Sequence, residues 1–182
     1  MGYDIIGDIH GCAEKLEALL TKLGYRKAAG TWRHAGRTAI FVGDFIDRGP
    51  EQVRSVQIVR RMVDDGTALA VMGNHELNAI AWHTKDLSTA DEFLRPHERL
   101  PWGPANRTQH AAFLAEVEHD SDLHAELVHW FLTLPLWLDL PDFRVIHACW
   151  HQKHLSWLRP LLTSQNGLRR ELLPAATIES AD

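Results

Sequence analysis

The chain has 182 residues, of which 45% are hydrophobic, enough to bury one sizeable core within a single domain. Its formal charge of −5 argues against the basic surface that nucleic-acid binding needs. No apolar run approaches the roughly 20 residues of a membrane span, and the first residues lack a secretory signal. We therefore expect a cytoplasmic protein that binds neither nucleic acid nor a membrane.

Three short apolar segments in the first half of the chain each end in a glycine followed by polar side chains. The segments are residues 3–6, 38–42 and 68–72, followed by Gly7-Asp8-Ile9-His10-Gly11, by Gly43-Asp44-Phe45-Ile46-Asp47-Arg48-Gly49 and by Gly73-Asn74-His75-Glu76. Each apolar segment predicts a buried strand. Because open α/β sheets bind ligands at the carboxyl ends of their strands, we expect the three loops to converge on one site.

Helical patterns follow the three loops. Residues 12–23 have leucines at helical spacing, residues 51–65 have an apolar and a basic face, and a third helix begins near residue 76. Residues 25–36, broken by glycines, predict a hairpin or an irregular connection. This alternation of strand and helix predicts an α/β fold with a largely parallel sheet covered by helices.

The middle of the chain is less regular. Residues 83–106 contain three prolines and many charges, which we interpret as an excursion or lid above the strand ends, where substrate choice would be made. Residues 108–118 and 121–132 predict two helices, the second with Ser121 as its N-cap.

The last part of the chain begins with a predicted hairpin. Its two strands are residues 136–140 and 143–146, and His147 follows the second strand directly. Residues 151–162 predict one more helix, and residues 165–182 show no strong pattern.

The three glycine-flanked motifs, with Val145-Ile146-His147, resemble those of the metal-dependent phosphoesterases of the calcineurin-like superfamily. The Asp-Arg-Gly form of the second motif most resembles the serine/threonine protein phosphatases and the bacterial diadenosine tetraphosphatases. The match covers about the first 150 residues. It implies a sandwich of mixed β-sheets flanked by helices.

The resemblance also implies a site for two divalent metal ions. Asp8 and His10 would hold the first ion, Asn74 and His147 the second, and Asp44 would bridge both. Carboxylate, amide and imidazole ligands without a thiolate suit Mn²⁺, Fe or Zn²⁺, whereas the imidazoles make Mg²⁺ less favoured.

Three further residues are implied to act on the substrate. Arg48 would clamp the phosphate with two parallel hydrogen bonds, His75 would protonate the leaving oxygen, and Asp47 would hold His75 in the useful tautomer. The implied reaction is hydrolysis of a phosphate ester by metal-activated water, without a covalent intermediate.

Structural interpretations compete with these roles. Asp and Asn after glycine are usually turn formers or helix caps, but three such motifs in the same order favour ligands. His151 either approaches the metals or starts a helix. We assign no chemical role to the histidines in polar or helical contexts, which are His34, His83, His97, His110, His119, His124, His129 and His154.

The substrate is a phosphorylated molecule, with a phosphoprotein or phosphomonoester preferred. The alternatives are symmetrical hydrolysis of a dinucleoside polyphosphate and a degenerate, non-catalytic phosphate-binding module. The superfamily's pattern continues with a further strand and a Gly-His element that supplies another ligand, and nothing after His151 fits it. We therefore expect residues 1–182 to form one domain without its C-terminal part, either the front of a longer protein or a shortened member.

Overall fold

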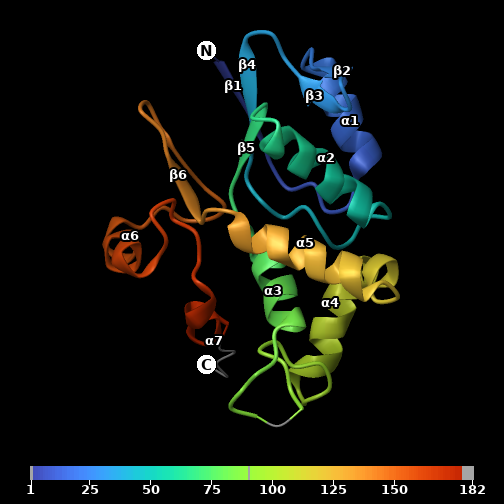
Figure 1. Cartoon of the computed structure of the whole chain (residues 1–182), viewed down its shortest axis with the longest axis vertical. Coiled ribbons are helices and arrows are strands. Elements are labelled where there is room, and N and C mark those ends of the chain that lie inside the picture. The colour runs from blue at the N-terminus through green and yellow to red at the C-terminus, as the bar shows by residue number, and fades with distance from the viewer. Residues whose placement is uncertain (1, 90, 178–182) are drawn as a thin grey trace.

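A three-stranded parallel sheet forms the centre of the computed structural model, which describes residues 2–89 and 91–177 (Figure 1). The strand order is β1-β4-β5, and the strands are β1 Gly2–Ile6, β4 Arg37–Phe41 and β5 Ala68–Ala70. Both neighbouring pairs are parallel, with Ile40 of β4 opposite Ile5 of β1 and Leu69 of β5. The three strands predicted from the sequence are confirmed, so the three polar loops leave the same edge of the sheet.

Two helices and a hairpin complete the first half of the fold. The helices are α1 Ala13–Lys22 and α2 Gln52–Asp64, and the hairpin consists of β2 Arg26–Ala28 and β3 Thr31–Arg33. Leu16 of α1 and Val59 of α2 are buried in the same core as Phe41 of β4. Since side chains alternate across a strand, Phe41 and its neighbour Ile40 point to opposite faces of the sheet.

A second antiparallel hairpin packs beside the sheet. It consists of β6 Trp137–Asp139 and β7 Arg144–Ile146, and Val145 belongs to a separate buried cluster with Ile40 and Val71. The predicted hairpin is therefore confirmed. Helices on one face of a parallel sheet and an antiparallel hairpin against Ile40 on the other agree with the expected sandwich.

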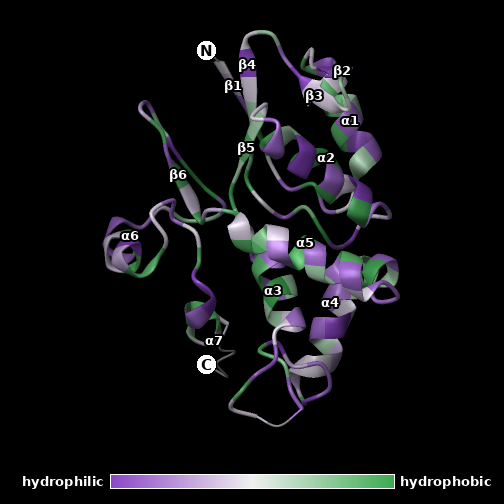
Figure 2. Ribbon diagram, in the orientation of Figure 1, coloured by the Kyte–Doolittle hydropathy of each residue, from purple (hydrophilic) through white to green (hydrophobic). Residues whose placement is uncertain are grey.

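The third layer is helical and lies below the sheet in Figure 1. It consists of α3 Asn74–His83, α4 Trp102–Val117 and α5 Ser121–Thr133. These helices carry hydrophobic and hydrophilic residues side by side (Figure 2), and their apolar side chains extend the main core, with Ile80, Phe113 and Phe131 fully buried.

Two boundaries in this layer differ from the sequence analysis. Helix α4 begins at Trp102, inside the segment interpreted as irregular. Pro104 does not prevent this start, because it lies in the first turn, where its missing N–H breaks no helical hydrogen bond. The N-cap of α5 is Asp120 rather than Ser121, since the Asp120 side chain accepts a hydrogen bond from the Leu123 N–H at 3.0 Å. Residues 84–101 connect α3 to α4, and their role as a lid stays a prediction.

The last part of the described chain consists of short helices. The helix predicted over residues 151–162 is split into α6 Gln152–Leu158 and the 3-10 turn η1 Arg159–Leu161, which contains Pro160. The 3-10 turn η2 Arg170–Leu172 and helix α7 Leu173–Ala176 follow. Among the residues described, none of the helices has the length and apolar character that crossing a bilayer requires.

Candidate metal centre

The first and second polar loops are joined by backbone hydrogen bonds. The Asp44 carbonyl accepts from the N–H groups of Ile9 and His10 at 3.0 and 2.9 Å, and the Phe45 carbonyl accepts from the Gly11 N–H at 2.8 Å. Beyond the ends of β1 and β4 the backbone groups are no longer paired within the sheet, and these hydrogen bonds satisfy them instead. As a result, the loops after β1 and β4 form one continuous surface.

The second and third loops are joined by the carboxylate of Glu76. It accepts hydrogen bonds from the backbone N–H groups of Asp44, Phe45 and Gly73 at 2.8, 2.8 and 3.0 Å. Glu76 is fully buried, and this burial, with the nearby charge of Asp44, raises its pKa to about 7 despite the three donors. A single buried side chain thus sets the position of Asp44.

Two glycines allow this close approach. Gly43 has a φ of +92°, and a Cβ there would collide with the backbone of Gly73. A Cβ on Gly73 would in turn collide with the backbone nitrogen and the carboxylate of Asp44. Both positions therefore require glycine.

The other four residues predicted as metal ligands lie around Asp44. The His10 Nε2 atom is 3.7 Å from an Asp8 carboxylate oxygen and 3.9 Å from Asp44 Oδ2. On the other side, His147 Nε2 is 3.5 Å from Asp44 Oδ1 and 3.1 Å from Asn74 Oδ1. Asp44 is the shared member of two groups of possible ligand atoms that lie within 4.8 Å of one another, one with His10 and His75 and the other with Asp8 and His147, as expected of a bridging residue.

The orientation of the two histidines fits metal binding. His10 Nδ1 donates to the Ile46 carbonyl at 2.9 Å and His147 Nδ1 to the Val42 carbonyl at 2.6 Å, which leaves each Nε2 lone pair facing the carboxylates. In the described part of the chain, the buried His10 Nε2 has no hydrogen-bond partner. A buried acceptor without a donor is costly, and a cation beside it would remove the cost.

His75 lies close enough to Asp44 for a second assignment. His10, Asp44 and His75 offer ligand atoms that all lie within 4.8 Å of one another. His75 Nε2 is 3.8 Å from Asp44 Oδ2, and the rings of His10 and His75 pack edge to face at 4.8 Å. The geometry alone therefore permits His75 to act as a ligand or as an acid.

The other ring nitrogen of His75 is held by Asp47. His75 Nδ1 donates to Asp47 Oδ2 at 2.6 Å, and His110 Nδ1 from α4 donates to the same oxygen at 2.9 Å. Burial acts to raise the pKa of Asp47, but the hydrogen bonds from His110 and His75 outweigh it, and the pKa is lowered. Burial acts to lower the pKa of His75, but the Asp47 hydrogen bond and the Asp44 charge raise it overall.

Sequence reasoning missed His110 because its partner is 63 positions away and nothing local marks it. A histidine inside a helical pattern normally indicates only packing. No feature of the sequence could have predicted the contact between His110 and Asp47.

Arg48 is exposed at the edge of the centre. It lines a hollow of about 570 Å³ together with His75 and the face of α4 formed by Thr108, Gln109, Ala111 and Ala112. His10, Asp44, Asp47 and Arg48 all have positive φ angles, of 47°, 55°, 70° and 72°. Such strain in non-glycine residues is retained where function requires a particular side-chain direction.

His151 is the N-cap of α6. Its side chain accepts a hydrogen bond from the His154 N–H at 3.4 Å, and it is exposed. The interpretation of His151 as a helix start is therefore confirmed.

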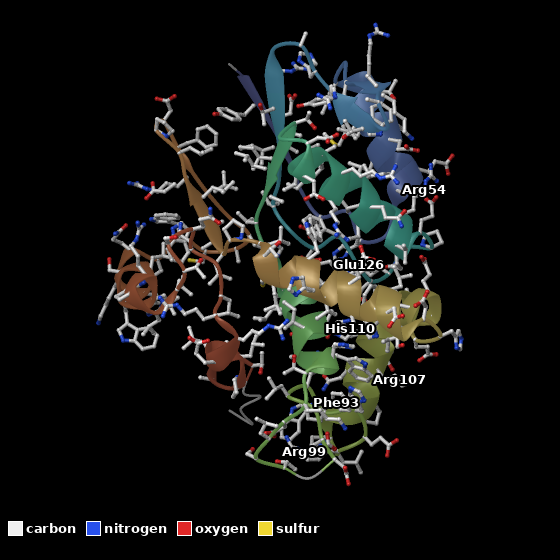
Figure 3. All side chains as sticks on the ribbon, viewed as in Figure 1. Arg54, Phe93, Arg99, Arg107, His110 and Glu126 are labelled. Atoms are coloured by element: carbon white, nitrogen blue, oxygen red, sulfur yellow. The ribbon has the colours of Figure 1, made fainter. Side chains whose placement is uncertain are left out.

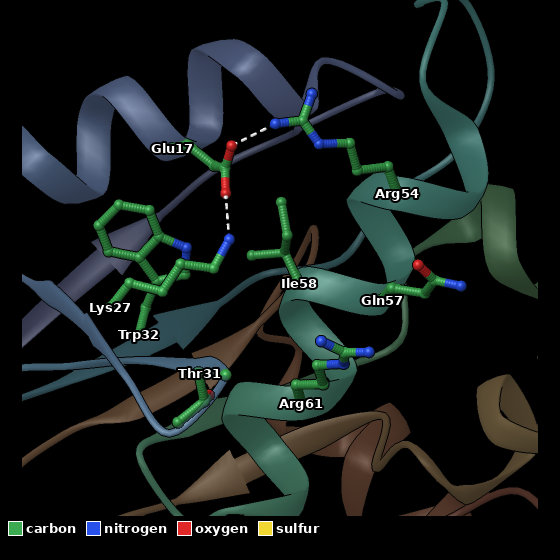
Figure 4. A pocket seen from close by; sticks show the side chains of 9 residues that line it. Glu17, Lys27, Thr31, Trp32, Arg54, Gln57, Ile58 and Arg61 are labelled. Atoms are coloured by element: carbon green, nitrogen blue, oxygen red, sulfur yellow. Dashed lines mark hydrogen bonds and ion pairs between the residues drawn. The ribbon is translucent and has the colours of Figure 1, made fainter.

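Another hollow lies between α1, α2 and β3 and contains none of the predicted ligands (Figure 4). Its cations Lys27 and Arg54 both pair with Glu17. Arg61 also lines this hollow, but the described residues that line it include one carboxylate and no imidazole, so it lacks the set of groups that holds a metal ion and is not a second metal centre.

Comparison with known proteins finds a family match over most of the chain. The family described as calcineurin-like phosphoesterase matches residues 1–173. A cold-active protein tyrosine phosphatase of known structure superposes with a TM-score of 0.56 at 19% identity, over 98% of this chain and 48% of that one. At this identity the superposition shows a shared fold and nothing further.

Two curated relatives share more sequence. The asymmetrical bis(5'-nucleosyl)-tetraphosphatase PrpE of Oceanobacillus iheyensis is 47% identical over 76 residues, 41% of this chain and 30% of that protein. The protein of the same description from Bacillus velezensis is 37% identical over 147 residues, 68% of this chain and 54% of that protein. The matched regions thus span about a third to a half of these relatives.

The role of Glu76 can be tested by truncation. We expect Glu76→Ala to lower the free energy of unfolding by roughly 2–4 kcal/mol, because three backbone N–H groups lose their acceptor. Mn²⁺ affinity should fall by about 10- to 100-fold, because Asp44 is no longer held in place. Urea unfolding and calorimetric titration measure the two effects.

Glu126→Ala is the control for this variant, because Glu126 is exposed and pairs with Arg60 on the surface. It should change stability by less than about 1 kcal/mol. Unchanged Mn²⁺ affinity in Glu76→Ala would contradict the positioning role.

Proposed function

The chain belongs to the calcineurin-like phosphoesterase family, and on that basis we propose that it hydrolyses phosphate esters or anhydrides at a dinuclear metal site. The observation that supports this most is the convergence of Asp8, His10, Asn74 and His147 on Asp44. Carboxylates alone would suit many cations, but two imidazoles aimed at a shared carboxylate favour a transition metal.

We assign Asp8, His10 and Asp44 to one ion, and Asp44, Asn74 and His147 to the other. Manganese is the proposed metal, since mixed oxygen and imidazole ligands without thiolate suit it. Two such ions, when bound, lower the pKa of water and neutralise charge on the phosphoryl oxygens.

Arg48 binds and orients the phosphoryl group. Its guanidinium is permanently charged and offers two parallel N–H groups, which lysine does not. Because Arg48 is exposed beside His75, its side chain can reach the oxygens of a bound phosphate without rearrangement of the buried core.

His75 donates a proton to the leaving oxygen. Its Nδ1–H is engaged by Asp47 at 2.6 Å, so the proton available for transfer is the one on Nε2 of the protonated ring. The hollow lined by His75, Arg48 and α4 lies beside the donor, and we assign it to the leaving group.

Dinucleoside polyphosphates are the proposed substrate class. From the sequence alone, a phosphoprotein or phosphomonoester was the preferred substrate, and symmetrical cleavage of a dinucleoside polyphosphate was an alternative. The relatives named asymmetrical tetraphosphatases favour the dinucleotide and asymmetrical cleavage instead. With Mn²⁺, diadenosine tetraphosphate should yield ATP and AMP, and chromatography of the products separates this from the two ADP of symmetrical cleavage.

Two other outcomes of that assay would redirect the proposal. Turnover of p-nitrophenyl phosphate or a phosphopeptide, but not of diadenosine tetraphosphate, would favour the phosphomonoester class. Phosphate binding without turnover of any substrate would favour a non-catalytic module.

Because His75 is assigned to proton donation and Asp44 to metal binding, substitutions of the two residues should affect different properties. His75→Asn should lower turnover by about 10² to 10⁴ with unchanged metal content, because only proton donation is lost. Asp44→Asn should lose bound metal, because the bridging charge is removed. Metal analysis beside kinetics distinguishes these cases, and equal metal loss in both variants would make His75 a ligand.

The leaving-group hollow predicts selective steric blocking. Ala111→Trp should raise KM for diadenosine tetraphosphate by about tenfold or more and leave KM for p-nitrophenyl phosphate within about threefold, since only the larger group fills the hollow. Ala115→Trp, also exposed on α4 but outside the hollow, is the matched control. Equal effects of the two variants on diadenosine tetraphosphate would place the leaving group elsewhere.

A further inference from the structure

The carboxylate that orients His75 has a second histidine partner. Asp47 Oδ2 accepts from His75 Nδ1 at 2.6 Å and from His110 Nδ1 at 2.9 Å. Figure 3 shows His110 in the helical layer, away from the sheet. Since an ionised carboxylate only accepts hydrogen bonds, each of the two rings must carry a proton on Nδ1.

This contact is excluded from water. The side chains of Asp47 and His110 are 0% and 1% exposed. Among the described residues, Asp47 Oδ1 has no hydrogen-bond partner, so the two histidines act on one oxygen of a buried carboxylate. A buried carboxylate held by one partner would be free to turn about its terminal torsion, and a second donor restricts it.

Helix α4 also reaches the same loop by a second route. The Glu116 carboxylate accepts from the backbone N–H groups of Gln52 and Val53 at 2.7 and 2.9 Å, at the first turn of α2. The Gln52 side-chain oxygen in turn accepts from the Asp47 backbone N–H at 2.6 Å. Both the backbone and the carboxylate of Asp47 are therefore fixed by contacts that begin on α4.

We propose that His110 is a positioning residue for proton donation, acting through Asp47 to hold the His75 ring in line with the leaving oxygen. This inference rests on the proposed function, in which His75 is the acid. It makes α4 part of the catalytic arrangement, since one helix both supports the acid and lines the hollow that receives the leaving group.

The alternative is that His110 only fills space beside Trp82, whose ring meets it edge to face at 6.0 Å. The two explanations differ in how substrates respond. A fault in proton donation slows poor leaving groups more than good ones, because a good leaving group departs without protonation. A packing fault slows both alike.

The test compares turnover of phenyl phosphate with that of p-nitrophenyl phosphate, the better leaving group. His110→Leu and His110→Phe remove the donor with side chains of different shape, so that a packing fault peculiar to one does not decide the result. Both should lower kcat for phenyl phosphate by about tenfold or more, and for p-nitrophenyl phosphate by less than about threefold. His110→Asn, whose amide nitrogen lies near the position of Nδ1, should restore most of the loss.

His124→Leu is the matched control. His124 is also a buried histidine of the helical layer, and it packs against His83 and Phe113 without contacting Asp47. His124→Leu should change kcat for phenyl phosphate and for p-nitrophenyl phosphate by the same factor. The proposal would be overturned if His110→Leu lowered kcat equally for the two substrates, or if His110→Asn did not restore kcat for phenyl phosphate.

A readout without turnover separates this inference from the proposed function. Proton NMR of the metal-free protein should show two low-field imidazole N–H signals that disappear in Asp47→Asn. His110→Leu should lose one and shift the other. If the His75 signal did not shift in His110→Leu, the positioning role would be overturned. If the wild-type protein were inactive but the His75 signal still shifted in His110→Leu, only the proposed function would be refuted.

Discussion

The buried carboxylate of Glu76 connects the two loops on which the centre depends. By accepting N–H groups from Gly73, Asp44 and Phe45, it fixes the turn after β5 against the turn after β4. Two glycines make room for that contact, and the loop after β1 joins by backbone hydrogen bonds to Asp44. Asp44 therefore has little freedom to move, which is what a residue shared between two ligand groups requires.

The strained backbone of the site follows from the same constraint. His10, Asp44, Asp47 and Arg48 adopt left-handed conformations that each cost of order 1–3 kcal/mol. The hydrogen bonds between the loops and from Glu76 and Gln52 offset that cost. In return, the carboxylates and His10 Nε2 gather at one edge of the sheet while Arg48 faces outward.

Much of this arrangement was predictable from local sequence. The strands and the glycine-flanked loops have short-range signals, and parallel strands bring their ends together without any knowledge of packing. The start of α4 was missed because Pro104 argued against a helix, although the first turn tolerates a proline. His110 and the anchoring role of Glu76 depend on contacts between distant residues, and no local pattern encodes such contacts.

Diffraction from crystals containing Mn²⁺, with anomalous scattering to locate the ions, tests the central claim most directly. The account predicts two ions bridged by Asp44, with His10 and His147 each coordinating through Nε2 and His75 remaining bonded to Asp47. An ion coordinated by His75 together with His10 and Asp44, or no ion at Asp44, would contradict it.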